Sequence, residues 1–254
     1  MTESKNIQAQ KRFRVLLIGD NCDDVYQYGS VERISPEAPV PIFKYSHSEV
    51  RPGMAANVKE NLERLGCEVT FLSNNKSVKT RLIDIKSRQH IVRIDEDAQC
   101  DPIDILSDIF VLNHLYDAVV FSDYNKGTVT YELIEQFKED YSGPIFIDTK
   151  KEIVGRFEGC FVKINELEFS RLKTQCKDLI VTLGSQGARY LNKKFDAPKV
   201  EVVDVTGAGD TFLSALTYKY LCENDIEEAI KFAIRASSIT VQHFGVYAPS
   251  LDEI

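Results

Sequence analysis

The sequence predicts an α/β fold built on a mainly parallel central sheet. Short apolar runs recur along the chain, helix-like stretches lie between several of them, and the first run ends in a glycine and an acidic residue. Such alternation favours a parallel sheet covered by helices. The 254 residues suffice for one large domain and are few for two, so we expect a single domain over residues 13–254.

The expected strands follow from the apolar runs. The first lies at 13–18, where Phe-Arg-Val-Leu-Leu-Ile is closed by Gly19-Asp20, and similar runs occur at 117–122, 144–148, 159–164 and 179–182. Helices are expected at 55–65, 129–141, 208–222 and 226–243. Two segments, at about 40–50 and 80–95, mix β-forming with polar residues, and we expect them to form a small accessory sheet.

Composition excludes several classes of protein. Hydrophobic residues at 43% and charged residues at 28% indicate a folded, soluble chain. The net charge of -8 disfavours binding to nucleic acid or to membrane surfaces, so an anionic substrate would need a local basic site. The six cysteines show neither a CxxC pair nor zinc-finger spacing.

The termini and the apolar runs give an expected location. Residues 1–12 are polar and basic, and we expect them to form a flexible tail. No apolar run approaches the roughly 18 residues of a membrane span. We therefore expect a cytoplasmic protein.

The strongest chemical signal is the string Asp204-Val205-Thr206-Gly207-Ala208-Gly209-Asp210, which runs directly into an apolar helical stretch. The two glycines permit a tight turn, and the free N–H groups at a helix start attract an anion. Asp210, in the first helical turn, is placed to accept a proton from a hydroxyl in line with a phosphate. A short GxGD alone would more often be a helix cap, but the complete string favours phosphoryl transfer.

This string resembles the second signature of the ribokinase-like, or PfkB-type, carbohydrate kinases, which has the form D-T-x-G-A-G-D. The resemblance implies a three-layer α/β/α fold with a small β-sheet lid, and ATP and Mg²⁺ as cofactors. It also implies that Asp210 is the catalytic base and that the amides of Gly207, Ala208 and Gly209 form an anion hole. Alone, an acidic residue at a helix start would be explained by the helix dipole.

The N-terminal half resembles the first signature of the same family. Arg51-Pro52-Gly53-Met54-Ala55-Ala56-Asn57-Val58 matches at Gly53 and Asn57, which the resemblance places against the sugar. Met54 stands where a second glycine is usual. A side chain there occupies a position that normally lets the backbone approach a ligand closely.

Three further strings are similar to the heptose-7-phosphate kinase branch of the family: residues 19–29, 32–41 and 122–127. That branch phosphorylates the anomeric hydroxyl of D-glycero-D-manno-heptose 7-phosphate in lipopolysaccharide precursor synthesis. The resemblance covers most of residues 13–250 and implies a sugar or sugar phosphate as substrate.

Some residues are expected to bind the sugar hydroxyls of the substrate, and others its phosphate. Asp24 matches a family carboxylate that binds sugar hydroxyls, although Asp20 could serve equally or only end a strand. A substrate phosphate would need cations, and guanidinium groups suit phosphate oxygens. The candidates are Arg51, Arg88, Arg93 and Lys126.

Nucleotide-binding residues are expected in the C-terminal half. Asn165-Glu166-Leu167-Glu168 resembles the family N-x-x-E element, which implies that Asn165 and Glu168 help to place Mg²⁺ and phosphate, with Glu168 acting through water. Thr182-Leu183-Gly184-Ser185-Gln186-Gly187 resembles the strand and turn beside the nucleotide. These matches predict that Thr182, Gly184, Gly187 and Thr206 bind the nucleotide.

The chain is also shorter than a usual family kinase domain. Only seven residues separate Leu72 from Thr80, where relatives have a further helix and strand, and 169–178 is too short for a usual helix. We expect an exposed sheet edge that a second subunit could cover, and the resemblance implies a lid that also forms a homodimer contact. The nucleotidyltransferase domain that many heptose kinases carry is expected in another protein.

Two other functions remain open at this stage. The chain could phosphorylate another sugar, such as fructose, ribose or a nucleoside, or it could be a binding homologue with weakened catalysis. A Rossmann dehydrogenase is disfavoured because Gly19-Asp20-Asn21 lacks the G-x-G-x-x-G turn after the first strand.

Overall fold

An eight-stranded sheet forms the main body of the computed structural model, which describes residues 12–74, 76–104 and 114–254. The strand order is β12-β11-β10-β9-β8-β7-β1-β4. All pairs from β10 to β4 are parallel, and β11 and β12 are antiparallel additions at one edge. The strands are β1 (Arg14–Gly19), β4 (Glu68–Leu72), β7 (Ala118–Asp123), β8 (Ile145–Thr149), β9 (Phe161–Asn165), β10 (Leu179–Thr182), β11 (Ala188–Tyr190) and β12 (Lys193–Phe195). The predicted α/β class and mainly parallel sheet are confirmed.

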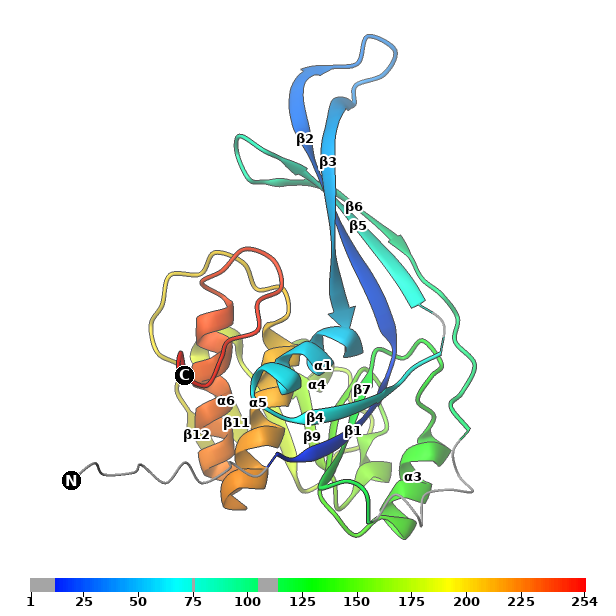
Figure 1. The fold of residues 1–254 in the computed structure, drawn as a ribbon, viewed down its shortest axis with the longest axis vertical. Helices are drawn as coiled ribbons and strands as arrows, with labels where there is room; N and C mark the ends of the chain where they lie inside the picture. Colours follow the sequence, from blue (N-terminus) through cyan, green and yellow to red (C-terminus); the bar gives the residue numbers. More distant parts are fainter. Residues whose placement is uncertain (1–11, 75, 105–113) are drawn as a thin grey trace, which may run out of the picture.

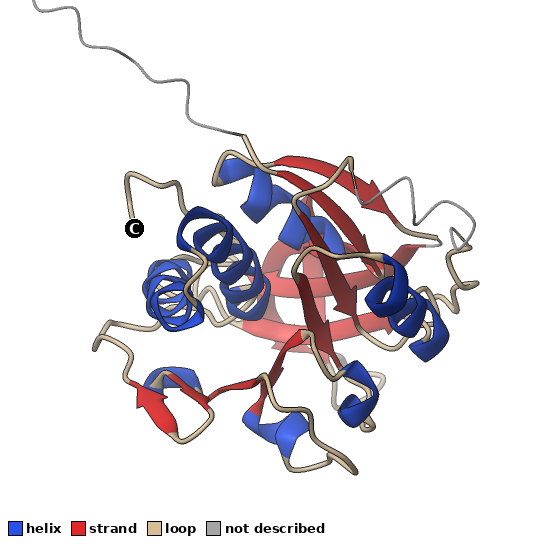
Figure 2. Ribbon diagram, turned by 90° about the horizontal axis from the view of Figure 1, so that it is seen from below, coloured by secondary structure: helices blue, strands red, loops and turns tan. Residues whose placement is uncertain are grey.

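Helices cover both faces of this sheet (Figure 2). They are α1 (Ala55–Arg64), α3 (Tyr131–Asp140), α4 (Glu166–Phe169), α5 (Ala208–Glu223) and α6 (Ile226–Thr240), with short 3₁₀ turns at Val154–Phe157 and Gly184–Gln186. Along β1, Val15 and Leu17 pack in one core with α1, α5 and α6, whereas Leu16 and Ile18 pack in the other with α3. This alternation follows from the period of two in a strand, and it gives three layers.

A second sheet of four strands projects from the main body as a lid (Figure 1). It contains β2 (Asn21–Ile34), β3 (Pro41–Met54), β5 (Lys76–Asp84) and β6 (His90–Glu96), in the order β3-β2-β5-β6. The predicted accessory segments, 40–50 and 80–95, lie within it. The strand β2 was not predicted, because its sequence includes Asp23, Asp24 and Gly29, which disfavour strands.

The strand register divides the lid into two faces. Asp24 pairs with Arg51 on β3 and with Lys79 on β5, so these three side chains lie on one face. We call this the inner face, because His90 and Tyr26 on it contact the ring of Phe244 in the C-terminal loop. The opposite, outer face carries exposed apolar side chains, which are 62% exposed at Val50, 47% at Val92 and 49% at Ile94.

The connections that appeared short in sequence are short in the structure. The strand β5 begins four residues after β4 ends, and in the described part of the chain β4 is the last strand at its edge of the main sheet. Between β9 and β10 the described chain forms only the four-residue helix α4. The predicted tail, 1–12, lies outside the described residues apart from Arg12.

Candidate active site

The predicted base, Asp210, lies in the first turn of α5 and is 5% exposed. Gly207 precedes the helix with φ of +79°, a left-handed conformation that glycine adopts without strain. Thr206 donates hydrogen bonds from its amide and hydroxyl to Asp204 Oδ1, at 2.9 and 2.7 Å. The string read from the sequence is thus a turn that directs the start of a buried helix toward the centre of the molecule.

Both carboxylate oxygens of Asp210 accept hydrogen bonds from side chains. Asn57 Nδ2 on α1 donates to Oδ2 at 2.8 Å, and the hydroxyl of Tyr124 donates to Oδ1 at 2.9 Å. Burial raises the pKa of Asp210 to about 6, and these two hydrogen bonds favour the charged form and limit the rise. A carboxylate with this pKa is ionised at neutral pH yet basic enough to take a proton.

The loop that carries Tyr124 is held by two buried aspartates. Asp20 accepts hydrogen bonds from the backbone amides of Tyr124, Lys126 and Thr128. Asp123 forms a buried ion pair with Lys151, with Nζ 2.9 Å from Oδ2. Asp20, one of the two acidic residues considered for sugar binding, therefore positions this loop.

A second buried ion pair lies beneath the start of α5. Lys163 Nζ on β9 is 2.6 Å from Asp148 Oδ2 at the end of β8. A Cβ added to Gly209 would lie 2.9 Å from this ammonium group. Burial alone would lower the pKa of Lys163, but the carboxylate of Asp148 outweighs it and raises the pKa, so the side chain stays charged.

The inner face of the lid closes the other side of the site. Asp24 Oδ1 pairs with Arg81 Nη2 at 3.1 Å, and both side chains are buried. A Cβ added to Gly53 would meet Asp24 Oδ2 at 2.8 Å, so only glycine fits beside this carboxylate. Arg51 donates to the carbonyl of Phe244 at 3.1 Å and, with Asn57, lines a cavity of about 260 Å³.

Met54 has a positive φ of +52° with ψ of -132°, a combination that favours glycine. It is buried and ends β3 where the chain enters α1. A non-glycine residue in such a sparsely populated conformation costs about 1–3 kcal/mol. The family glycine at this position therefore relieves backbone strain that this chain retains.

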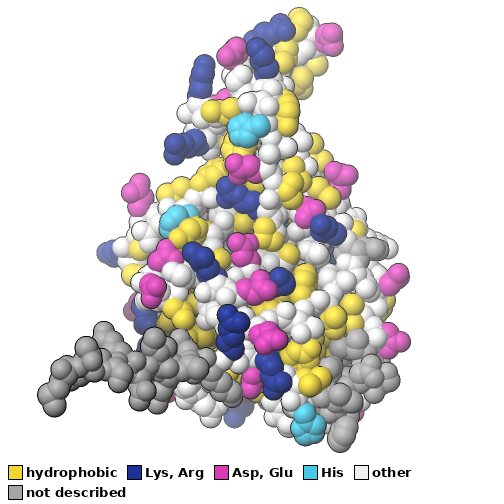
Figure 3. All heavy atoms as spheres, viewed as in Figure 1, with side chains coloured by type: hydrophobic (Ala, Val, Ile, Leu, Met, Phe, Trp, Pro, Cys, Tyr) yellow, Lys and Arg dark blue, Asp and Glu magenta, His cyan; other side chains and the backbone are white. Residues whose placement is uncertain are grey.

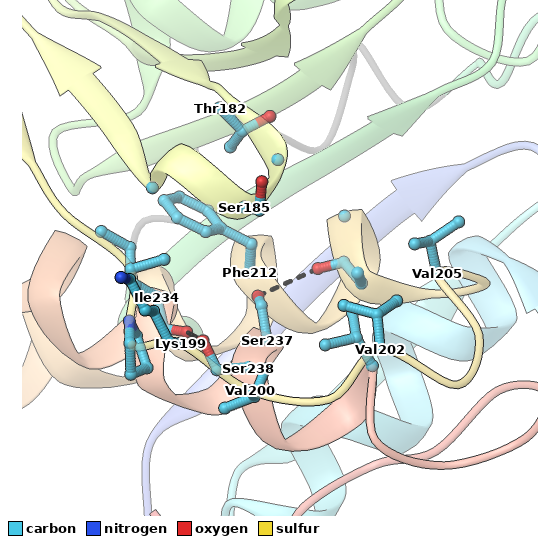
Figure 4. Close-up of a pocket in the computed structure, with 17 residues that line it drawn as sticks. Thr182, Ser185, Lys199, Val200, Val202, Val205, Phe212, Ile234, Ser237 and Ser238 are labelled. Carbon is cyan, nitrogen blue, oxygen red and sulfur yellow. Dashed lines mark hydrogen bonds between the residues drawn. The ribbon is translucent and has the colours of Figure 1, made fainter.

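A cavity of about 440 Å³ lies on the other side of the α5 start (Figure 4). Its walls are largely apolar, and Phe212 and Ile234 are among them. Three of the predicted nucleotide residues (Thr182, Gly184 and Gly187) and two of the predicted anion-hole residues (Ala208 and Gly209) line it. Ser237 Oγ donates to the carbonyl of Ala208 at 3.1 Å and so joins α6 to the turn. An apolar cavity next to the start of a helix suits a nucleotide base with its phosphates.

The other predicted nucleotide residues do not line this cavity. Asn165 and Glu168 form a reciprocal capping box at the start of α4, which satisfies the side chains of both. Thr206 is held by Asp204, as described above. The N-x-x-E match is thus explained locally by helix capping, in addition to its expected role in placing Mg²⁺ and phosphate.

Three of the four predicted phosphate-binding cations are already paired, and the fourth is exposed. Arg51 pairs with Glu49, Arg93 with Asp95, and Lys126 with Asp97. Arg88 lies in the exposed turn between β5 and β6. The structure does not bring these four side chains together around Asp210.

Sequence reasoning missed several residues of the site. Tyr124 contacts Asp210, Arg81 contacts Asp24, and Lys163 lies beneath Gly209. Tyr124 lies in the string at 122–127, whose resemblance to the heptose kinase branch could have pointed to it as a site residue. The positions of Arg81 and Lys163 depend on strand register, which a single sequence does not reveal.

The carboxylates around the α5 start fit a hydrated magnesium ion. Asp148, Glu168 and Asp210 all act electrostatically on Lys163. In the described residues no three His, Cys, Asp or Glu side chains form a metal-binding group. Magnesium commonly takes one or two carboxylates and completes its shell with water and substrate phosphate.

No helix in the described ranges is long and apolar enough to cross a membrane.

Comparisons with known proteins show which family part of the chain matches and how much of a longer relative it spans. Residues 163–253 match the family described as pfkB family carbohydrate kinase. The bifunctional protein HldE of a Nitratiruptor species is 32% identical over 296 residues, covering 95% of this chain but only 64% of that protein. Because this alignment exceeds 254 residues, the relative contains residues that this chain lacks, in agreement with the short connections.

Solved structures agree on the fold. Arabidopsis thaliana ribokinase, complexed with ribose and ATP, superposes with a TM-score of 0.74 at 17% identity, covering 96% of this chain and 97% of that one. The ribokinase of Thermotoga maritima gives a TM-score of 0.66 at 18% identity, covering 95% and 97%. The fold is therefore ribokinase-like, and residues 163–253 carry the match to the pfkB family of carbohydrate kinases.

Proposed function

We propose that this protein transfers the γ-phosphoryl group of ATP to a hydroxyl of a sugar, with Asp210 as the base. The observation that carries this proposal is the position of Asp210: it is buried, with a pKa of about 6, between an apolar cavity and the inner face of the lid. The base and phosphates of ATP would occupy the cavity, and the sugar would lie against Asp24, Gly53 and Asn57.

The site residues divide the reaction between them. Asp210 accepts the proton of the sugar hydroxyl as that oxygen attacks the phosphoryl group. The helix start at 207–209 and the ammonium of Lys163 stabilise the negative charge that develops on the phosphoryl oxygens. Glu168 and Asp148 would hold Mg²⁺ through water, and this ion would neutralise charge on the nucleotide phosphates.

We propose that the acceptor is a heptose 7-phosphate, phosphorylated at its anomeric hydroxyl to give the 1,7-bisphosphate. The support is the resemblance of residues 19–41 and 122–127 to the heptose-7-phosphate kinase branch, together with the similarity to HldE. A cytoplasmic location fits a reaction that consumes ATP. We further propose a homodimer in which the outer faces of two lids meet, because this face exposes apolar side chains.

Two measurements test the proposed reaction. ADP release with a panel of phosphorylated heptoses, hexoses and pentoses identifies the acceptor and separates a heptose kinase from a kinase for another sugar. Asp210→Asn removes the base but preserves the shape of the side chain. We expect turnover to fall by about 100- to 10,000-fold while ATP binding persists. Near-normal turnover in this variant would refute the assignment of the base.

A further inference from the structure

The inner face of the lid carries four cations that come from three strands. Register places Lys79 opposite Asp24 and places Arg81 opposite both Tyr26 and Arg93. Three of these cations are paired with carboxylates on the same face: Arg51 with Glu49, Arg81 with Asp24, and Arg93 with Asp95. The half-buried Lys79 forms no ion pair with any described residue. The inner face thus has one cation in excess.

This unpaired cation approaches the ring of Tyr124, the residue that hydrogen-bonds to the proposed base. Lys79 Nζ is 5.7 Å from the ring centroid of Tyr124, whose hydroxyl bonds to Asp210. Lys150, the exposed residue that follows β8, approaches the same ring to 4.7 Å and also forms no ion pair within the described part of the chain. Two ammonium groups that form no ion pair within the described residues therefore approach the ring of Tyr124. In a chain with a net charge of -8, they supply the local basic site that an anionic acceptor requires.

Unused hydrogen-bond donors lie on the same face of the lid as Lys79. Arg81 Nε and the hydroxyl of Tyr26 are buried and have no hydrogen-bond partner among the described residues. The guanidinium of Arg81 lies 5.7 Å from the centroid of the Tyr26 ring, so the two groups are neighbours. Most buried donors in proteins have a partner, because an unpaired donor loses its bond to water without compensation. A hydrogen-bond acceptor such as a phosphate oxygen would satisfy these donors.

We propose that Lys79 and Lys150, supported by Arg81, form a subsite for a phosphate monoester on the acceptor, at the end remote from the hydroxyl that reacts. This inference rests on the proposed kinase function and assigns the residues that recognise its acceptor. Ammonium groups bind phosphate as point charges, and a guanidinium adds directed hydrogen bonds. The subsite differs from the sequence-based assignment of Arg51, Arg88, Arg93 and Lys126, which stays a prediction.

Acceptor binding by calorimetry tests the subsite without requiring turnover. The probes are D-glycero-D-manno-heptose 7-phosphate and the same heptose without its phosphate, each titrated into the full chain. We expect wild-type protein to prefer the phosphate ester. Lys79→Met should weaken binding of the ester by about 10- to 100-fold and leave binding of the free heptose unchanged. Lys86→Met is the matched control, because Lys86 is an exposed lid lysine in the turn after β5.

The outcomes separate the subsite from the reaction. Equal binding of both sugars by wild-type protein, or an equal loss for both in Lys79→Met, overturns the subsite even if the enzyme turns over. If the ester binds as expected but no ADP is released, the subsite stands and the kinase proposal fails. Arg81→Lys retains the charge beside Asp24 and removes Nε, so a weaker affinity for the ester alone gives independent support. An unchanged affinity removes Arg81 from the subsite.

Discussion

The hydroxyl of Tyr124 donates a 2.9 Å hydrogen bond to Asp210 Oδ1. Asn57 occupies the other carboxylate oxygen, so the orientation of Asp210 is fixed from two directions. Each carboxylate oxygen can accept more than one hydrogen bond, so a substrate hydroxyl can approach while both contacts persist. The proposed base is therefore preorganised, and its neighbours set both its direction and its pKa.

Loss of the Tyr124 hydroxyl should move the pH dependence of the reaction. A base must be deprotonated, so kcat/KM of the wild-type enzyme should rise with pH through about 6, the pKa of Asp210. The hydrogen bond from Tyr124 lowers this pKa, so Tyr124→Phe should shift the rising limb to higher pH. A pH series of kcat/KM measures the shift. Activity well above the new pKa should fall less than activity below it.

A matched control is Tyr28→Phe, which removes a lid hydroxyl whose ring stacks on His47, away from Asp210. It should leave the limb where it is. A Tyr124→Phe profile that falls in height at every pH without moving along the pH axis would show that Tyr124 has only a packing role.

The buried pair of Asp123 and Lys151 should be a major determinant of stability. Lys151→Met leaves the carboxylate of Asp123 buried without its cation, and loss of one partner of a buried pair costs about 3–5 kcal/mol. Chemical denaturation should detect this loss in the free energy of unfolding. The exposed pair of Lys173 and Glu152 provides the control, because Lys173→Met should change stability little. Similar effects in the two variants would contradict the importance assigned to burial.

The turn at Gly209 should separate activity from stability. Alanine is the better helix former, and this gain offsets the shift that the new Cβ forces on the buried Lys163, so Gly209→Ala should change stability by less than about 1 kcal/mol. The new Cβ would lie 2.9 Å from Lys163 Nζ and fill space where the phosphoryl group is proposed to bind. We expect kcat to fall by about 100-fold, as when a charge-stabilising donor is lost. Steady-state kinetics and thermal unfolding on the same preparation test both parts, and a parallel loss of stability would contradict this explanation.

The sequence predicted five of the eight strands of the main sheet and the long helices, because their patterns are local, but it did not predict β4, β11 or β12. The strands at 14–19 and 118–123 are continuous apolar runs, and the helix at 208–223 begins at a recognisable glycine turn. Prediction failed for β2, where polar residues form a long strand whose stability depends on pairing with β3 and β5. It also failed for Lys79, Arg81 and Lys163, which reach the site only through the register of neighbouring strands.

The outer face of the lid provides the last test, which concerns assembly. Val50, Val92 and Ile94 lie on this face by register and remain exposed, and hydrophobic side chains are visible between the charged ones along the lid (Figure 3). An exposed apolar sheet face is stabilised when a second copy covers it. Val50→Asp should therefore turn a dimer into a monomer in light scattering, because it would bury a charge at the interface. Leu191→Asp, at an exposed apolar position in the main body, should leave the dimer intact. A wild-type protein that is monomeric at micromolar concentration would contradict the proposed dimer and leave the apolar face without an assigned partner.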